Sequence, residues 1–124
     1  MKRIIIGVIM LLLSTNAFAY QHDKWQTHNT ILEVAFIAAL SIDSCQTYNA
    51  LYNQKGFSEN NPIYMTGRPS PKRLLSYYSF CVISHASIAY LLPMGYREAW
   101  QSIWTFLEIT QDFKNYTTGA RLRF

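Results

Sequence analysis

The sequence contains none of the short motifs that identify a reaction. It has no HExxH, no CxxC and no Gly-x-Ser-x-Gly, and its five glycines are scattered singly, so no phosphate-binding loop is present. No internal repeat occurs either. These absences argue against the zinc peptidases, dithiol oxidoreductases, serine hydrolases and P-loop proteins that such motifs define, and we predict no catalytic residue.

Charge is also scarce. Lys2 and Arg3 account for two of the 11 basic residues, and the remaining nine face seven acidic residues over the rest of the chain. These basic residues are dispersed and are not interleaved with aromatic residues in a patch. So small an excess does not support nucleic-acid binding.

Cysteine is limited to Cys45 and Cys81. An even pair in an exported protein is a candidate disulfide. If two helices form a hairpin around residues 53–70, the two cysteines lie at similar distances from the loop along the helix axes, because a helix rises about 1.5 Å per residue. The alternative interpretation is two small buried apolar side chains.

The first 19 residues have the pattern of a secretory signal peptide. Lys2 and Arg3 precede an apolar run from Ile4 to Leu13, and Ala17-Phe18-Ala19 follows as a small-x-small cleavage signature. The apolar run is shorter than the roughly 20 residues that span a bilayer. The sequence therefore predicts cleavage after Ala19, export to the bacterial inner membrane or periplasm, and one small helical domain over residues 20–124.

Three helices are predicted, so the fold class is all-α, a small three-helix bundle. The first helix begins at Thr30, where Thr30 and Glu33 form a capping-box pattern, and ends near Asn53. The second begins at Pro71, with Ser70 as its N-cap, and ends at about Leu92.

The third predicted helix, from about Tyr96 to Tyr116, is amphipathic. Its polar side is most simply a solvated face, and its apolar side could cover the second helix. Trp100 and Trp104 near its start are candidates for an interaction surface, because an exposed indole often marks a contact. The polar side contains Arg97, Gln101, Trp104, Glu108, Gln111, Asp112 and Asn115.

The topology has two interpretations. The stretch Leu74–Leu92 has no formal charge over a span-length segment, and with two spans the basic loop around Lys55 and Arg68 would lie in the cytoplasm. Against this, the mean hydropathy beyond residue 19 is typical of soluble proteins, and Asp43 and His85 would be costly at bilayer depth unless paired. Both an integral membrane protein and a soluble periplasmic domain stapled by a disulfide remain open.

A set of polar residues forms the candidate site. Asp43 interrupts an apolar helix with Thr47 one turn later, and a buried carboxylate there would need partners. If the set converged between the helices, it could bind a divalent metal or perform acid–base chemistry. Each residue also has a simpler interpretation. Asp43 could lie on the exposed edge of its helix, His85 could be a hydrogen-bonded packing residue, and Glu59 and Asn61 could belong to a turn. The set is Asp43, Thr47, Glu59, Asn61, His85, Glu108 and Asn115.

The order of these polar residues resembles a group of small uncharacterised helical envelope or membrane proteins of proteobacteria and their phages. The resemblance implies a shared polar cluster and no known activity. It rests on Asp43-x-x-Gln46-Thr47, Glu59-x-Asn61-Pro62, Gly67-x-Pro69-Ser70, His85, Arg97-x-x-Trp100-Gln101, Glu108 and Asn115.

Two classes of function follow. The first is a non-enzymatic, membrane-associated envelope protein that binds a membrane or an envelope partner through its aromatic-rich amphipathic helix. The second is a small envelope hydrolase that uses the Asp/Glu/His cluster, with a divalent metal as its one candidate cofactor.

Overall fold

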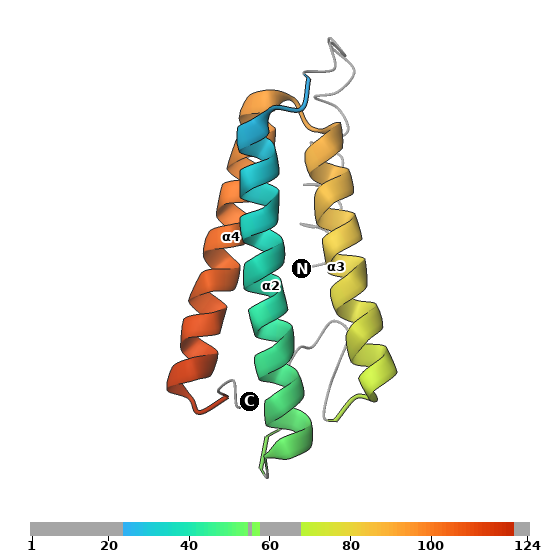
Figure 1. Cartoon of the computed structure of the whole chain (residues 1–124), viewed down its shortest axis with the longest axis vertical. Coiled ribbons are helices and arrows are strands. Elements are labelled where there is room, and N and C mark those ends of the chain that lie inside the picture. Colours follow the sequence, from blue (N-terminus) through green and yellow to red (C-terminus); the bar gives the residue numbers. More distant parts are fainter. Residues whose placement is uncertain (1–23, 55, 58–67, 121–124) are drawn as a thin grey trace, which may run out of the picture.

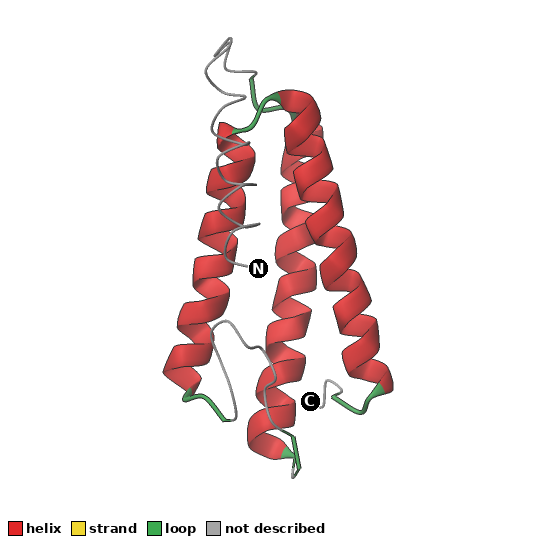
Figure 2. Ribbon diagram, turned by 180° about the vertical axis from the view of Figure 1, so that it is seen from behind, coloured by secondary structure: helices red, strands yellow, loops and turns green. Residues whose placement is uncertain are grey.

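The computed structural model describes residues 24–54, 56–57 and 68–120, which form three helices. They are α2 (Thr27–Asn53), α3 (Pro71–Leu91) and α4 (Met94–Thr117) (Figure 1). No strand occurs in these ranges, and the all-α bundle that the sequence predicts is confirmed (Figure 2). The predicted signal peptide lies outside the described residues.

The helices run along one another and alternate in direction. α2 and α4 point the same way, and α3 runs back between the end of α2 and the start of α4 (Figure 1). We call the end where Leu92 and Pro93 join α3 to α4 the turn end, and the end where α2 stops and α3 starts the loop end. α2 packs more extensively on α4 than α3 packs on either.

Local sequence signals explain where the helices begin. Ser70 accepts a hydrogen bond from the Arg73 amide at 3.3 Å with Pro71 in the first helical position, as predicted. α2 begins three residues before the predicted start, because Gln26 and Asn29 cap it: Asn29 Oδ1 accepts from the Gln26 amide at 3.1 Å. The predicted capping box between Thr30 and Glu33 is therefore wrong, since the Glu33 side chain is buried and contacts His85 of α3 instead.

Arg97 fixes the turn between α3 and α4. Its side chain is 1% exposed, and its guanidinium donates to the carbonyls of Ala89 at 2.9 Å and Leu92 at 3.0 Å. The last carbonyls of a helix have no partner within the helix, and a cation there also complements the helix dipole. Arg97 therefore caps α3 from α4.

Apolar packing holds α2 to α3. Phe36 and Leu40 of α2 meet Leu74 and Tyr78 of α3, and all four are buried. This core is small for three helices of more than 20 residues each. Something other than apolar packing must therefore hold α4.

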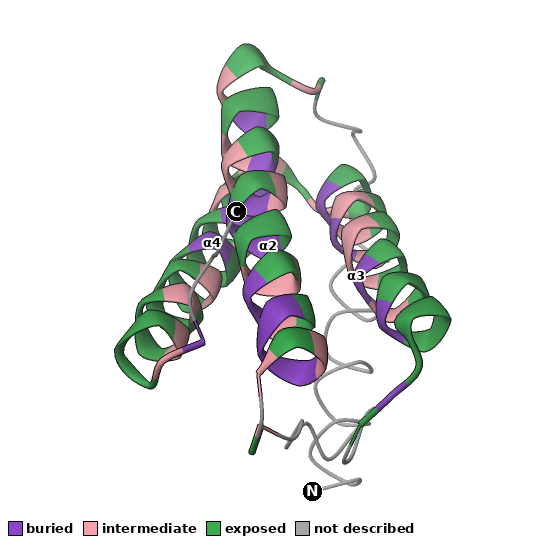
Figure 3. Cartoon of the chain, turned by 60° about the horizontal axis from the view of Figure 1, so that its bottom comes forward, coloured by how far each residue is buried: buried purple, intermediate pink, exposed green. Residues whose placement is uncertain are grey.

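The polar stripe of α4 faces inward and its apolar stripe faces outward. Gln101 and Thr105 are buried, whereas Phe106 and Phe113 are 68% and 70% exposed. The exposed positions cover the outer sides of α3 and α4 (Figure 3). The prediction of a solvated polar face is therefore wrong, because these polar residues pair with polar residues of α2.

α2 and α3 are each long and apolar enough to cross a membrane. Only 33% of the residues in the most apolar stretch of α2, and 22% in that of α3, are buried within the bundle. The core helix of a soluble protein would be mostly buried. Most residues of these two stretches are instead not buried by the rest of the bundle.

Candidate functional site in the bundle interior

Polar side chains between the helices form two clusters, of which the first is buried and the second is mostly half-buried. The histidine cluster lies toward the turn end and consists of Asn29 and Glu33 of α2, His85 of α3 and Gln101 of α4. The acidic cluster lies toward the loop end and consists of Asp43 and Thr47 of α2, Tyr78 of α3, and Glu108, Asp112 and Asn115 of α4.

In the histidine cluster, Glu33 is the central acceptor. Its Oε1 lies 2.9 Å from His85 Nδ1, and its Oε2 accepts from Gln101 Nε2 at 2.9 Å. Gln101 Nε2 also donates to the Asn29 carbonyl at 3.0 Å, while Asn29 Nδ2 donates to Gln101 Oε1 at 3.3 Å. Buried polar groups are costly unless hydrogen-bonded. Here the hydrogen bonds run between helices, so donors on one helix are paired with acceptors on another.

The His85 ring is held on both faces by aromatic rings. Phe36 stacks on it with a centroid separation of 3.7 Å, and Trp100 stacks at 5.6 Å. Trp100 Nε1 also donates to the His85 carbonyl at 3.3 Å. His85 is 3% exposed, yet its Nε2 has no hydrogen-bond partner among the described residues.

The acidic cluster centres on Asp43. Its Oδ2 accepts from the Tyr78 hydroxyl and its Oδ1 from Asn115 Nδ2, each at 2.5 Å. The Tyr78 oxygen also lies 3.2 Å from Thr47 Oγ1. The predicted polar set contains Asp43, Thr47 and Asn115, which lie together here, and the structure adds Tyr78 to them.

Two further carboxyl groups approach Asp43 from α4. Both Asp43 and Asp112 lie close enough for their charges to act on Glu108. Gln46 Nε2 binds the Asp112 backbone carbonyl at 3.3 Å, while Asp112 Oδ1 is buried without a hydrogen-bond partner in the described part of the chain. Three carboxyl groups therefore share this region, and the cluster contains no lysine or arginine.

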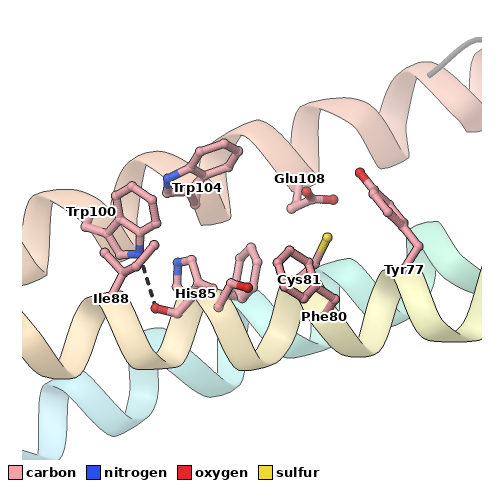
Figure 4. Close-up of a pocket in the computed structure, with 10 residues that line it drawn as sticks. Tyr77, Phe80, Cys81, His85, Ile88, Trp100, Trp104 and Glu108 are labelled. Carbon is pink, nitrogen blue, oxygen red and sulfur yellow. Dashed lines mark hydrogen bonds between the residues drawn. The ribbon is translucent and has the colours of Figure 1, made fainter. Parts of the chain in front are cut away.

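A pocket of about 240 Å³ lies between α3 and α4. Its walls are mostly aromatic and come from Phe36, Tyr77, Phe80, Trp100 and Trp104. Figure 4 shows Trp100, Trp104 and Glu108 of α4 facing the side chains of α3, with His85 toward one end of the pocket and Glu108 toward the other. The pocket thus joins the two clusters.

The sequence-predicted site residues are only partly brought together. Asp43 and Thr47 both hydrogen-bond the Tyr78 hydroxyl, Asn115 donates to Asp43, and Glu108 lies beside them. His85 belongs to the other cluster. Glu59 and Asn61 lie outside the described residues.

Sequence reasoning missed Glu33 and Asn29 as site residues. They lie one helical turn apart, which places them on the same face of α2. Glu33 was assigned instead to a capping box, although a carboxylate just ahead of an apolar run could also have indicated a buried partner.

The two cysteines are both free, so the candidate disulfide is not formed in this structure. Cys45 is exposed, whereas Cys81 is half-buried and lines the pocket. Within the described ranges no group of three or more His, Cys, Asp and Glu side chains could hold a metal ion. His85 is paired with Glu33 and not with Asp43, which separates the imidazole from the carboxyl groups that a metal would need.

Comparison of the sequence with known protein families, with curated proteins and with solved structures finds no match in any of the three. The resemblance to small envelope proteins of proteobacteria and their phages therefore stays a prediction.

Proposed function

We propose that this chain is an integral membrane protein of the bacterial envelope that binds its partner inside the bilayer and catalyses no reaction. The observation that carries the proposal is the inverted polarity of the bundle. The fully buried side chains include Arg97, Gln101 and Asn29, whereas large apolar side chains cover the outside.

Physical cost favours lipid as the surroundings of that outer surface. Each Å² of apolar surface left in water forgoes about 25 cal/mol, and 13 large hydrophobic side chains of α3 and α4 are exposed. In a bilayer the same apolar side chains would contact lipid tails instead of water, and this cost would not arise. Polar residues must then face the interior and pair with one another, as the two clusters do.

α4 belongs to the proposed membrane domain although its composition alone does not identify it. Its five charged residues lower its mean hydropathy, but Arg97, Glu108 and Asp112 point toward α2 or α3, and the other two, Glu98 and Lys114, lie near its ends. Its outward residues include Ile103, Phe106, Leu107, Ile109 and Phe113. Because α4 packs along α2, a bilayer that contains α2 also contains α4.

The charge distribution supports one orientation. Arg68 precedes α3 and Lys72 and Arg73 lie in its first turn, at the loop end, and Lys114 lies near the end of α4 on the same side. The turn end has Lys24 and the buried Arg97. Basic residues favour the cytoplasmic side, so we place the loop end in the cytoplasm and the turn end in the periplasm.

A fractionation experiment tests the membrane proposal. The chain, tagged at its C-terminus, is expressed in a bacterial host, and its membranes are washed with alkaline carbonate. We expect the protein to stay in the membrane pellet. Release by osmotic shock would contradict the proposal and would favour the periplasmic domain.

Two reporter fusions test the orientation. A C-terminal green fluorescent protein should be fluorescent, because that end lies in the cytoplasm, and a C-terminal alkaline phosphatase should be inactive. Fusion of each reporter between Leu92 and Pro93 should reverse both results.

A second candidate function is acid–base chemistry at His85. The observation in its favour is the carboxylate–histidine pair, which holds the imidazole while Nε2 stays without a partner. No serine, threonine or cysteine among the described residues bonds to Nε2, so the substrate or water would have to supply the reacting group. Turnover of a fluorogenic ester that is lost in His85→Gln would support this candidate.

A further inference from the structure

We propose that the pocket between α3 and α4 binds a lipid-soluble aromatic alcohol of the hydroquinone class, with the ligand hydroxyl donating to His85 Nε2. The inference rests on the proposed membrane function and names the ligand chemistry of its site. Four observations carry it: the unpartnered nitrogen, the aromatic walls, the position of the opening and the carboxyl group at the far end.

The hydrogen bonds of Glu33 define what His85 offers to a ligand. Both carboxylate oxygens of Glu33 act as acceptors, one toward Gln101 Nε2 and the other toward His85 Nδ1. The Nδ1 atom therefore carries a proton, and in the neutral imidazole Nε2 keeps its lone pair. A buried acceptor without a partner is costly, and a ligand hydroxyl would satisfy it.

The walls select a flat, apolar ring. Five aromatic side chains line the pocket, and Phe36 and Trp100 already hold the His85 ring from both faces. Aromatic rings favour stacked or edge-to-face neighbours. Since an apolar cavity of about 150 Å³ holds benzene, the 240 Å³ pocket has room for one substituted ring.

The opening of the pocket lies on the apolar outer surface. Phe80 and Trp104 line the pocket and are 64% and 39% exposed. In the proposed membrane orientation this opening faces lipid, so a ligand would enter from the bilayer. An alkyl or isoprenoid tail on the ring could remain in the lipid while the ring is bound.

The far end of the pocket favours a second hydroxyl. Glu108 lies opposite His85 along the pocket (Figure 4) and belongs to the acidic cluster, which has no cation. A carboxyl group accepts a hydroxyl proton readily. A ring with hydroxyl groups at opposite positions, which is a hydroquinone, would therefore meet an acceptor at each end.

A ligand series on the unmodified protein gives the sharpest test. The purified chain in lipid nanodiscs is titrated with a decyl-substituted hydroquinone, and quenching of tryptophan fluorescence is followed, because Trp100 and Trp104 line the site. We expect saturable binding. The corresponding dimethyl ether has the same ring without donors, and we expect it to bind about thirtyfold more weakly, since it loses two hydrogen bonds of about 1 kcal/mol each.

Two results of that series would overturn the proposal. The first is the absence of saturable quenching by the hydroquinone. The second is equal affinity for the hydroquinone and its dimethyl ether, which would show that no ligand hydroxyl donates in the site.

Variants locate the site without depending on one substitution. His85→Gln should lower hydroquinone affinity about fivefold and leave the affinity for the dimethyl ether unchanged. Ser84→Trp fills the pocket next to His85 and should abolish binding of both compounds. The matched control is His28→Gln, because His28 pairs with Glu98 away from the pocket and is half-exposed. Hydroquinone affinity that survives both His85→Gln and Ser84→Trp would refute the assignment.

Failure of this proposal can be told apart from failure of the membrane proposal. Carbonate resistance is measured on the same preparation before titration. A carbonate-resistant protein that binds no hydroquinone contradicts the ligand assignment alone, whereas a protein released by the wash contradicts the membrane function on which it rests.

Discussion

The histidine cluster and the acidic cluster both join all three helices, but they balance charge differently. In the histidine cluster the Glu33 carboxylate faces donors from His85 and Gln101. In the acidic cluster Asp43 has two donors, Tyr78 and Asn115, while Glu108 and Asp112 add carboxyl groups without a cation. The first cluster therefore contributes mainly to stability, and the second keeps like charges close together.

This difference distinguishes polar residues that hold the helices together from polar residues that are kept for a function. A polar network that satisfies its own members can hold helices together within a bilayer. Carboxyl groups that repel one another are retained at a cost, which is a common property of functional sites. The pocket lies between the two, with the unpartnered His85 Nε2 as the one exception in the balanced cluster.

Removal of Glu33 should have the largest effect. Glu33→Leu leaves His85 and Gln101 buried without their acceptor, and we expect a loss of about 3–5 kcal/mol in the free energy of unfolding. The measurement is denaturant unfolding in detergent micelles. Glu98→Leu is the control, because Glu98 pairs with His28 at 43% and 44% exposure and should cost less than about 1 kcal/mol. Similar losses for the two variants would show that the histidine cluster does not stabilise the bundle.

Loss of the Tyr78 hydroxyl should have an intermediate effect. Tyr78→Phe removes one of two donors to Asp43 and keeps the ring in the core, so we expect a loss of about 1.5–3 kcal/mol. Tyr96→Phe, at an exposed position of α4, should leave stability unchanged within about 0.5 kcal/mol. If the two substitutions changed the free energy of unfolding equally, the hydrogen bond from Tyr78 to Asp43 would not stabilise the bundle.

The same substitution in the two clusters should have opposite signs. Glu108→Gln removes one of three neighbouring carboxyl groups, and at a pH where they are ionised, like charges one helical turn apart, as at Glu108 and Asp112, destabilise by a few tenths of a kcal/mol. With the charge of Asp43 included, we expect a gain of about 0.5–1 kcal/mol. Glu33→Gln should instead destabilise, because its amide nitrogen would face another donor. Destabilisation by both variants would contradict the contrast between the clusters.

The helices themselves could be predicted from the sequence because their signals are local. Ser70 followed by Pro71 fixes the start of α3, and Pro93 after Leu92 ends it. The amphipathic pattern of α4 is equally plain. These features depend on neighbouring residues in the chain, so they need no knowledge of the fold.

The direction in which α4 faces could not be predicted in the same way. An amphipathic stripe shows that a helix has two sides, but only the surroundings decide which side is inside. In water the apolar residues around Phe106 would be buried. In lipid the polar residues around Gln101 would be buried instead. The pairing of Glu33 with His85 was hidden for a related reason, because 52 residues separate them.

The central claim is that the apolar outer face of α4 contacts lipid, and a spin label at position 106 tests it most directly. Phe106→Cys is introduced after Cys45 and Cys81 are replaced by alanine, and the labelled chain is placed in vesicles. Collisions of the label with oxygen, which concentrates in lipid, are compared with collisions with a water-soluble nickel complex. We predict high accessibility to oxygen and low accessibility to nickel. The reverse order would place this face in water and contradict the account.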